Sequence, residues 1–91
     1  MNPRDVLNKI RWEEGEAALG ELEIWYLHRG APDDTMVVEG RDIVGIERSY
    51  LVLRGEAGET RIPFHRVLRI VRGADVVWVR RPASKPGPET G

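Results

Sequence analysis

The sequence predicts an α+β domain in which one N-terminal helix packs on a bent, barrel-like antiparallel sheet of five or six short strands. Apolar residues recur at three- and four-residue spacing only near the N-terminus, which is typical of one amphipathic helix. From residue 21 onward they alternate with polar residues, as in half-buried strands. Glycine and proline interrupt this alternation at short intervals, so we expect short strands and a strongly bent sheet.

The predicted helix begins at Pro3 and ends between Ile10 and Trp12. Asn2 can cap its first turn, and Pro3 suits the first helical position because its φ angle is already helical. The apolar stripe of this helix consists of Val6, Leu7 and Ile10. We expect that stripe to pack on the sheet, with Trp12 following it into the core.

The first predicted strand covers residues 22–29 and ends at the break that Gly30 and Pro32 introduce. Its alternation places four residues on one face, namely Leu22, Ile24, Tyr26 and His28. The strand pattern is weaker at residues 36–39 and 43–46, where Gly45 disfavours the second strand, and clearer at residues 50–54, 59–62, 67–72 and 76–81. The last four form two hairpins, and Pro63 predicts a turn or bulge before residue 67.

Length and composition predict one domain over residues 1–81 and a disordered, proline-rich tail over residues 82–91. No apolar run is long enough to cross a membrane, and the N-terminus lacks the apolar segment of a secretory signal, so we expect a cytoplasmic protein. The absence of cysteine excludes disulfides and thiolate chemistry, and no structural zinc site is expected. Glycine-rich phosphate loops are also missing, so no nucleotide cofactor is predicted.

The net charge of −1 conceals an uneven distribution. Residues 1–40 carry a net charge of −5, whereas residues 41–91 carry +4. A near-neutral chain does not present the broad basic face of a nucleic-acid coating protein. It remains compatible with a small pocket that holds one phosphate or one RNA end.

Both histidines are followed directly by arginine, in His28-Arg29 and in His65-Arg66. An imidazole that titrates near physiological pH beside a permanently charged planar guanidinium suits a phosphate. Each pair stands beside a strand break, at Gly30 or Pro63, where adjacent side chains are freed from strict alternation and can serve one site. Because arginine makes up about one residue in eight, the two pairs can also arise by chance and serve as surface groups.

These segments resemble a small, mostly archaeal family, the RNA cyclic-group end recognition domain, formerly an uncharacterised protein family. The similarity runs in order from about residue 2 to residue 81, and its most distinctive part is the segment from Ile62 to Val67. The other matching segments are Asn2 to Leu7 with Trp12, Tyr26 to Gly30, and Val77-Trp78. The resemblance implies binding of RNA ends that carry a 2′,3′-cyclic phosphate, in association with RNA-processing enzymes such as cyclic phosphodiesterases and nucleotidyltransferases.

The resemblance also implies which residues form the site. The polar motif positions are Tyr26, Arg29, His65 and Arg66, and the aromatic positions are Trp12 and Trp78. Two guanidiniums, Arg29 and Arg66, can grip the exposed oxygens of a cyclic phosphate, and His65 can donate a further hydrogen bond. His28 joins the predicted site, and Tyr26 can stack on the terminal base, whereas the tryptophans are expected in the core.

Three alternatives remain open from the sequence. His28 and His65 can act as base and acid in a phosphodiesterase or another RNA-end-processing enzyme. The family also has an acidic residue at the position of His28, which argues against a general mechanism with two histidines. A divalent metal held by the histidines with Asp33 and Asp34 has no supporting ligand spacing. The acidic first half could instead dock on a basic protein, which would make the chain a protein-interaction module.

Overall fold

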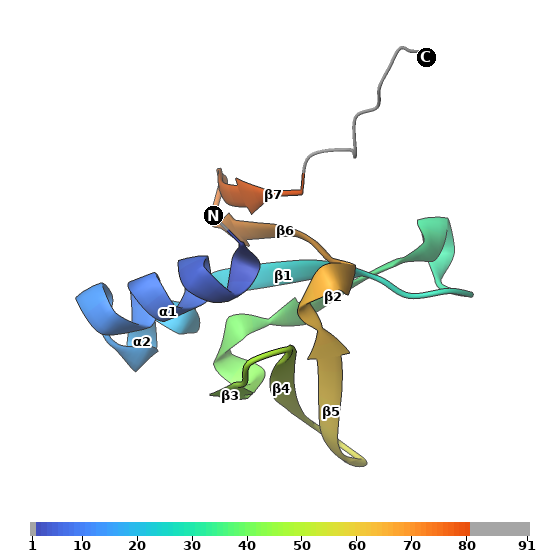
Figure 1. The fold of residues 1–91 in the computed structure, drawn as a ribbon. Helices are drawn as coiled ribbons and strands as arrows, with labels where there is room; N and C mark the ends of the chain where they lie inside the picture. The colour runs from blue at the N-terminus through green and yellow to red at the C-terminus, as the bar shows by residue number, and fades with distance from the viewer. Residues whose placement is uncertain (1, 81–91) are drawn as a thin grey trace.

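The computed structural model describes residues 2–80. This part of the chain contains two helices and seven strands, and the strands form two antiparallel sheets (Figure 1). The first sheet has the order β2-β1-β6-β7, with strands at Leu22–Leu27 (β1), Thr35–Glu39 (β2), Val67–Arg72 (β6) and Asp75–Val79 (β7). The second sheet has the order β3-β4-β5, with strands at Ile43–Ile46 (β3), Tyr50–Gly55 (β4) and Gly58–Pro63 (β5). In Figure 1 the second sheet lies below the first, with both helices beside them.

The mixed helix and sheet class is confirmed, but the single barrel-like sheet of five or six strands is not. Seven strands divide between two sheets, and no closed barrel is found among residues 2–80. Short 3-10 turns move the chain between the sheets: Gly40–Asp42 (η2) leads into the second sheet, and Phe64–Arg66 (η3) leads back. Pro63 ends β5 at the second of these turns, where its missing N–H and fixed φ disfavour a continued strand.

Helix α1 spans Pro3–Glu14 and begins as predicted, because the Asn2 side chain accepts a 2.8 Å hydrogen bond from the Asp5 N–H. It extends beyond Trp12 until Gly15, whose φ of 91° ends it. The expectation that Trp12 enters the core is wrong, since its side chain is 83% exposed. At about 100° per residue, Trp12 points roughly 200° away from Ile10 and leaves the buried stripe. A second helix, the single turn Glu16–Leu19 (α2), was not predicted.

One hydrophobic core connects the helices with both sheets. Its fully buried side chains are Leu7, Leu22, Ile24, Leu51, Val67 and Ile70. Helix α1 contacts β3, β6 and β7, so it closes the space between the two sheets. The predicted tail over residues 82–91 lies outside the described residues. Within residues 2–80, neither helix has the length and apolar character needed to cross a membrane.

Candidate functional site

The antiparallel pairing of β1 with β6 brings the two His-Arg pairs to the same end of the first sheet. Tyr26 pairs with Val67, so the residues that follow β1 lie beside those that precede β6. His28-Arg29 follow the end of β1, and His65-Arg66 lie in η3, directly before β6. Both pairs line one depression of about 490 Å³ together with Leu27. We call this depression the end pocket.

His28 lies outside β1, which corrects the prediction that it continues one face of a strand over residues 22–29. The strand ends at Leu27, and the His28 N–H donates to the Asp34 carbonyl at 2.7 Å in the loop that leads to β2. In the same loop the Gly30 N–H donates to the Asp34 carboxylate at 3.3 Å, and Gly30 has a φ of 92°. These bonds hold the loop that carries Arg29.

The turn η3, which carries His65 and Arg66, is anchored from several sides. Phe64 is buried in the core, and its N–H donates to the Ser49 carbonyl at 3.0 Å. The Arg80 guanidinium donates to the carbonyls at both ends of the turn, through Nη2 to Phe64 at 2.8 Å and through Nε to Val67 at 2.9 Å. Arg80 is therefore a positioning residue for the end pocket. This role has no signal in the sequence, because the partners of Arg80 are backbone carbonyls 13 and 16 positions away.

The end pocket has a strongly positive lining. The side chains of His28, Arg29, His65 and Arg66 are all exposed, and none of the acidic residues among positions 2–80 lines the pocket. Within residues 2–80, the Arg29 and Arg66 guanidiniums form no hydrogen bond or ion pair. Two unpaired planar guanidiniums that face one cavity can each donate two parallel hydrogen bonds to an anion.

Tyr26 does not line the end pocket. Its side chain is only 9% exposed and packs in the core, and its hydroxyl lies 4.0 Å from the Met36 sulfur. Its ring meets the His28 ring edge-on, with 6.1 Å between centroids and an interplanar angle of 80°. This position supports the imidazole of His28 and leaves little surface on which a base could stack.

The remaining tryptophans lie on opposite sides of the first sheet. Trp78 is half-buried and packs against the core, as expected. Trp25 is half-buried on the outer face, where the Arg69 guanidinium lies 4.1 Å from its ring centroid. The expectation that Trp25 belongs to the core is therefore wrong, because the alternation of β1 directs Leu22, Ile24 and Tyr26 inward instead.

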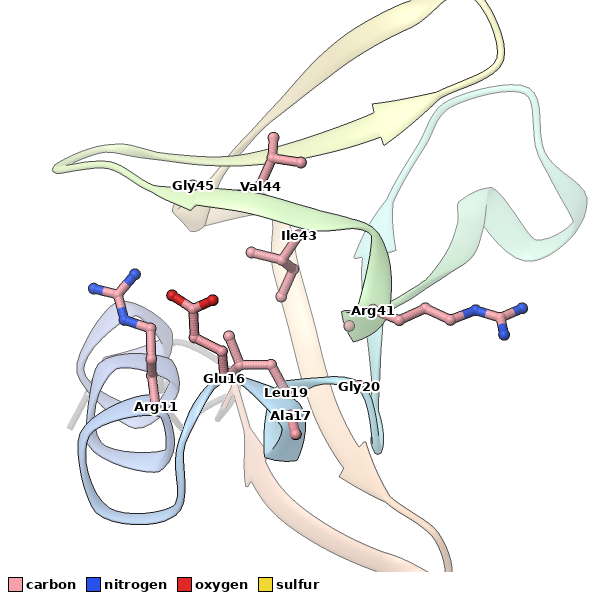
Figure 2. Close-up of a pocket in the computed structure, with 10 residues that line it drawn as sticks. Arg11, Glu16, Ala17, Leu19, Gly20, Arg41, Ile43, Val44 and Gly45 are labelled. Atoms are coloured by element: carbon pink, nitrogen blue, oxygen red, sulfur yellow. The ribbon is translucent and has the colours of Figure 1, made fainter.

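Another depression, of about 440 Å³, lies between the helices and β3 (Figure 2). Figure 2 shows Arg11 and Glu16 pointing from the helices toward β3, while Arg41 points away from the cavity. Arg41 is paired with Glu39 at 3.0 Å. Opposite charges line this cavity, so it is a poorer anion site than the end pocket. Residues 2–80 also contain no cluster of three or more side chains suited to hold a metal ion.

Comparison with known proteins gives a match over nearly all of the described chain. Residues 1–80 match the model of the MJ1316 RNA cyclic group end recognition domain. The chain belongs to this family. A UPF0248 protein of Methanococcus maripaludis strain C7 is 41% identical over 80 residues, covering 86% of this chain and 97% of that protein. A UPF0248 protein of Saccharolobus solfataricus is 32% identical over 82 residues, covering 88% and 98%.

The family assignment confirms the resemblance seen in the sequence and the mostly archaeal character of its members. No solved structure matches the chain. The family's description names an RNA end that carries a cyclic group, whereas the names of the relatives state no activity.

Proposed function

We propose that this domain binds the 3′ end of RNA that carries a 2′,3′-cyclic phosphate, and that it does so without turning the RNA over. The observation that carries the proposal is the end pocket, which is lined by two arginines, two histidines and no acidic residue of the described part of the chain. The family description supports the RNA end as the ligand class. RNA-processing enzymes are the partners that such a domain would serve.

The chemistry of a cyclic phosphate suits this lining. The group carries one negative charge on two exposed oxygens, and each guanidinium of Arg29 and Arg66 can grip them in a bidentate manner. His65, which lines the same pocket, can donate a further hydrogen bond. An end with free 2′ and 3′ hydroxyls offers no such charge, so affinity should depend on the cyclic group.

A second candidate function is favoured by one observation. Both histidines line the same pocket, so His28 and His65 could act as base and acid on a bound phosphodiester. In such an enzyme one histidine would deprotonate a water that attacks the phosphorus, and the other would protonate the ribose oxygen that leaves, which opens the ring to a 2′- or 3′-phosphate. Binding without turnover is the primary proposal, because the family description names recognition of an RNA end and states no catalytic activity.

The test compares one short single-stranded RNA with two different ends, a 2′,3′-cyclic phosphate and free hydroxyls. Fluorescence anisotropy at fixed salt should show roughly ten- to a hundredfold tighter binding of the cyclic end, since a charge-assisted contact contributes about 1.5 to 3 kcal/mol. Arg66→Ala should abolish this preference and leave the fold intact, because Arg66 is exposed. Arg54→Ala is the matched control, since Arg54 is an exposed arginine of β4 that does not line the end pocket.

Equal affinity for the two ends would refute end recognition. The cyclic RNA is also followed over hours by chromatography. Ring opening that is lost in both His28→Ala and His65→Ala would establish the enzyme instead. Cross-linking in cell extract that captures a basic protein rather than RNA would favour the interaction module.

A further inference from the structure

We infer that a second depression beside the end pocket binds the internucleotide phosphate on the 5′ side of the terminal nucleotide. The ligand of the domain is then at least a dinucleotide rather than a lone cyclic nucleotide. This inference rests on the proposed function, which it extends from the terminal group to the strand behind it.

The second depression has a volume of about 400 Å³ and is lined by Arg4, Arg48 and Arg80 together with His65. We call it the side pocket. His65 lines both pockets, so the two cavities meet at one imidazole. Four segments build the side pocket: the first turn of α1, the connection between β3 and β4, η3, and Arg80 directly after β7. The hydrogen bond from the Phe64 N–H to the Ser49 carbonyl, at 3.0 Å, holds η3 to the connection between β3 and β4.

The arginines of the side pocket have guanidinium N–H groups that can donate hydrogen bonds to a ligand. Arg48 is exposed and forms no hydrogen bond or ion pair with another residue of the described chain. The Nε atom of Arg4 is buried and has no hydrogen-bond partner among residues 2–80, and its Nη1 lies 3.9 Å from the exposed carboxylate of Asp5. Arg80 uses Nε and Nη2 on backbone carbonyls, and its guanidinium lies 5.3 Å from the centroid of the Trp78 ring. Its Nη1 donates to no residue of the described chain and can donate to a ligand. Of the acidic residues that the structure describes, none lines the pocket.

The chemistry of the proposed ligand decides which phosphate lies there. In a 2′,3′-cyclic end, both ring hydroxyls of the terminal ribose are occupied, so the strand continues only from its 5′ oxygen. The nearest further negative charge is therefore the phosphate on that oxygen. With the cyclic phosphate in the end pocket, we expect the 5′ side of the same nucleotide at the rim of that pocket. The cavity that adjoins the end pocket at His65 is the side pocket, which is lined by arginines.

The experiment uses the full chain and three ligands with the same cyclic end, of which two differ only in the charge of one phosphate. They are a nucleoside 2′,3′-cyclic phosphate with a free 5′ hydroxyl, a dinucleotide with the same cyclic end, and that dinucleotide with an uncharged methylphosphonate linkage. Competition against a labelled RNA should show the charged dinucleotide binding about three- to tenfold more tightly than either of the others. The methylphosphonate separates the phosphate charge from stacking of the second base.

Arg48→Ala should remove the advantage of the charged dinucleotide and leave the affinity for the cyclic mononucleotide unchanged. Arg54→Ala, which removes the same charge from outside both pockets, should preserve it. If the charged and uncharged dinucleotides bind equally while the cyclic mononucleotide still binds, the side pocket is refuted and end recognition stands. If no cyclic ligand binds better than its hydroxyl counterpart, both proposals fall. Equal losses for all three ligands in Arg48→Ala would also refute a phosphate-specific role.

Discussion

Gly40 follows β2, at the point where the chain leaves the first sheet. Glycine is required there by close contacts with neighbouring residues, and not by an unusual backbone angle. It is buried at the start of η2 and has no positive φ. A Cβ atom at this position would overlap the Leu19 carbonyl group and lie 3.2 Å from the Leu22 Cβ. The close approach of α2 to η2 therefore depends on the missing side chain.

We expect Gly40→Ala to lower the free energy of unfolding by about 1 to 3 kcal/mol, because backbone must move to admit one methyl group. Urea unfolding followed by circular dichroism measures the change. Gly45→Ala is the control, since the nearest atoms to its added Cβ lie at 3.6 Å or more. Similar unfolding midpoints for the two variants would show that the chain relaxes around Gly40 without cost.

At the scale of elements, Arg72 joins β6 to two segments that precede β1. Its Nη1 and Nη2 atoms donate to the Glu14 carboxylate at the end of α1, at 3.1 and 2.7 Å. Its Nε donates to Glu21 at 2.9 Å. The hydrogen bond from Arg72 lowers the pKa of Glu14, and those to Glu14 and Glu21 raise the pKa of Arg72.

This cluster predicts a pH-dependent contribution to stability. Because folding lowers the pKa of Glu14 from its ordinary value of 4.5, the stabilisation is fully present above pH 4.5 and is lost as the pH falls through the lowered value. Glu14→Gln should lower the Tm at pH 7, and its difference from the unaltered protein should shrink in acid. Thermal melts across this range test it, with the exposed neighbour Glu13→Gln as control. A difference that persists undiminished in acid would mean that Glu14 acts through packing alone.

At the scale of the whole molecule, the two sheets share one core, so they should unfold together. Leu51 of β4 is fully buried and belongs to the same cluster as Ile24 of β1 and Leu7 of α1. The three tryptophans lie in α1 and the first sheet, outside the sheet that contains Leu51. Tryptophan fluorescence therefore reports on one part of the molecule when the other is altered.

Leu51→Ala should cost about 2 to 5 kcal/mol, as for other large-to-small changes at fully buried sites. The tryptophan fluorescence and far-ultraviolet dichroism transitions should shift by the same amount, because one cooperative unit has one transition. The comparison variant is Val44→Ala, at an exposed position of β3, which should leave both transitions nearly in place. A fluorescence transition that stays unshifted in Leu51→Ala would show that the sheets unfold independently.

The local signals of the chain were sufficient to predict helix α1 and the seven strands, but not the single helical turn α2. Asn2 and Pro3 mark the start of α1, and the turn glycines mark two hairpins that the structure places at residues 50–63 and 67–79. Capping, turn chemistry and alternation act over a few neighbouring residues, so they can be recognised without a fold. The same signals predicted that the breaks at Gly30 and Pro63 free the His-Arg pairs from strand alternation.

The tertiary structure alone decided that these pairs meet. The ladder between β1 and β6 pairs residues that are 41 to 50 positions apart, and its register shifts between Trp25 and Tyr26. The contacts by which Arg80 holds η3, and the exposure of Trp12, likewise depend on how distant parts of the chain pack together. Strand order and register depend on which apolar faces, distant in the sequence, pack against each other. The burial of a side chain likewise depends on the elements that cover it. A local pattern indicates only that one face of an element is apolar.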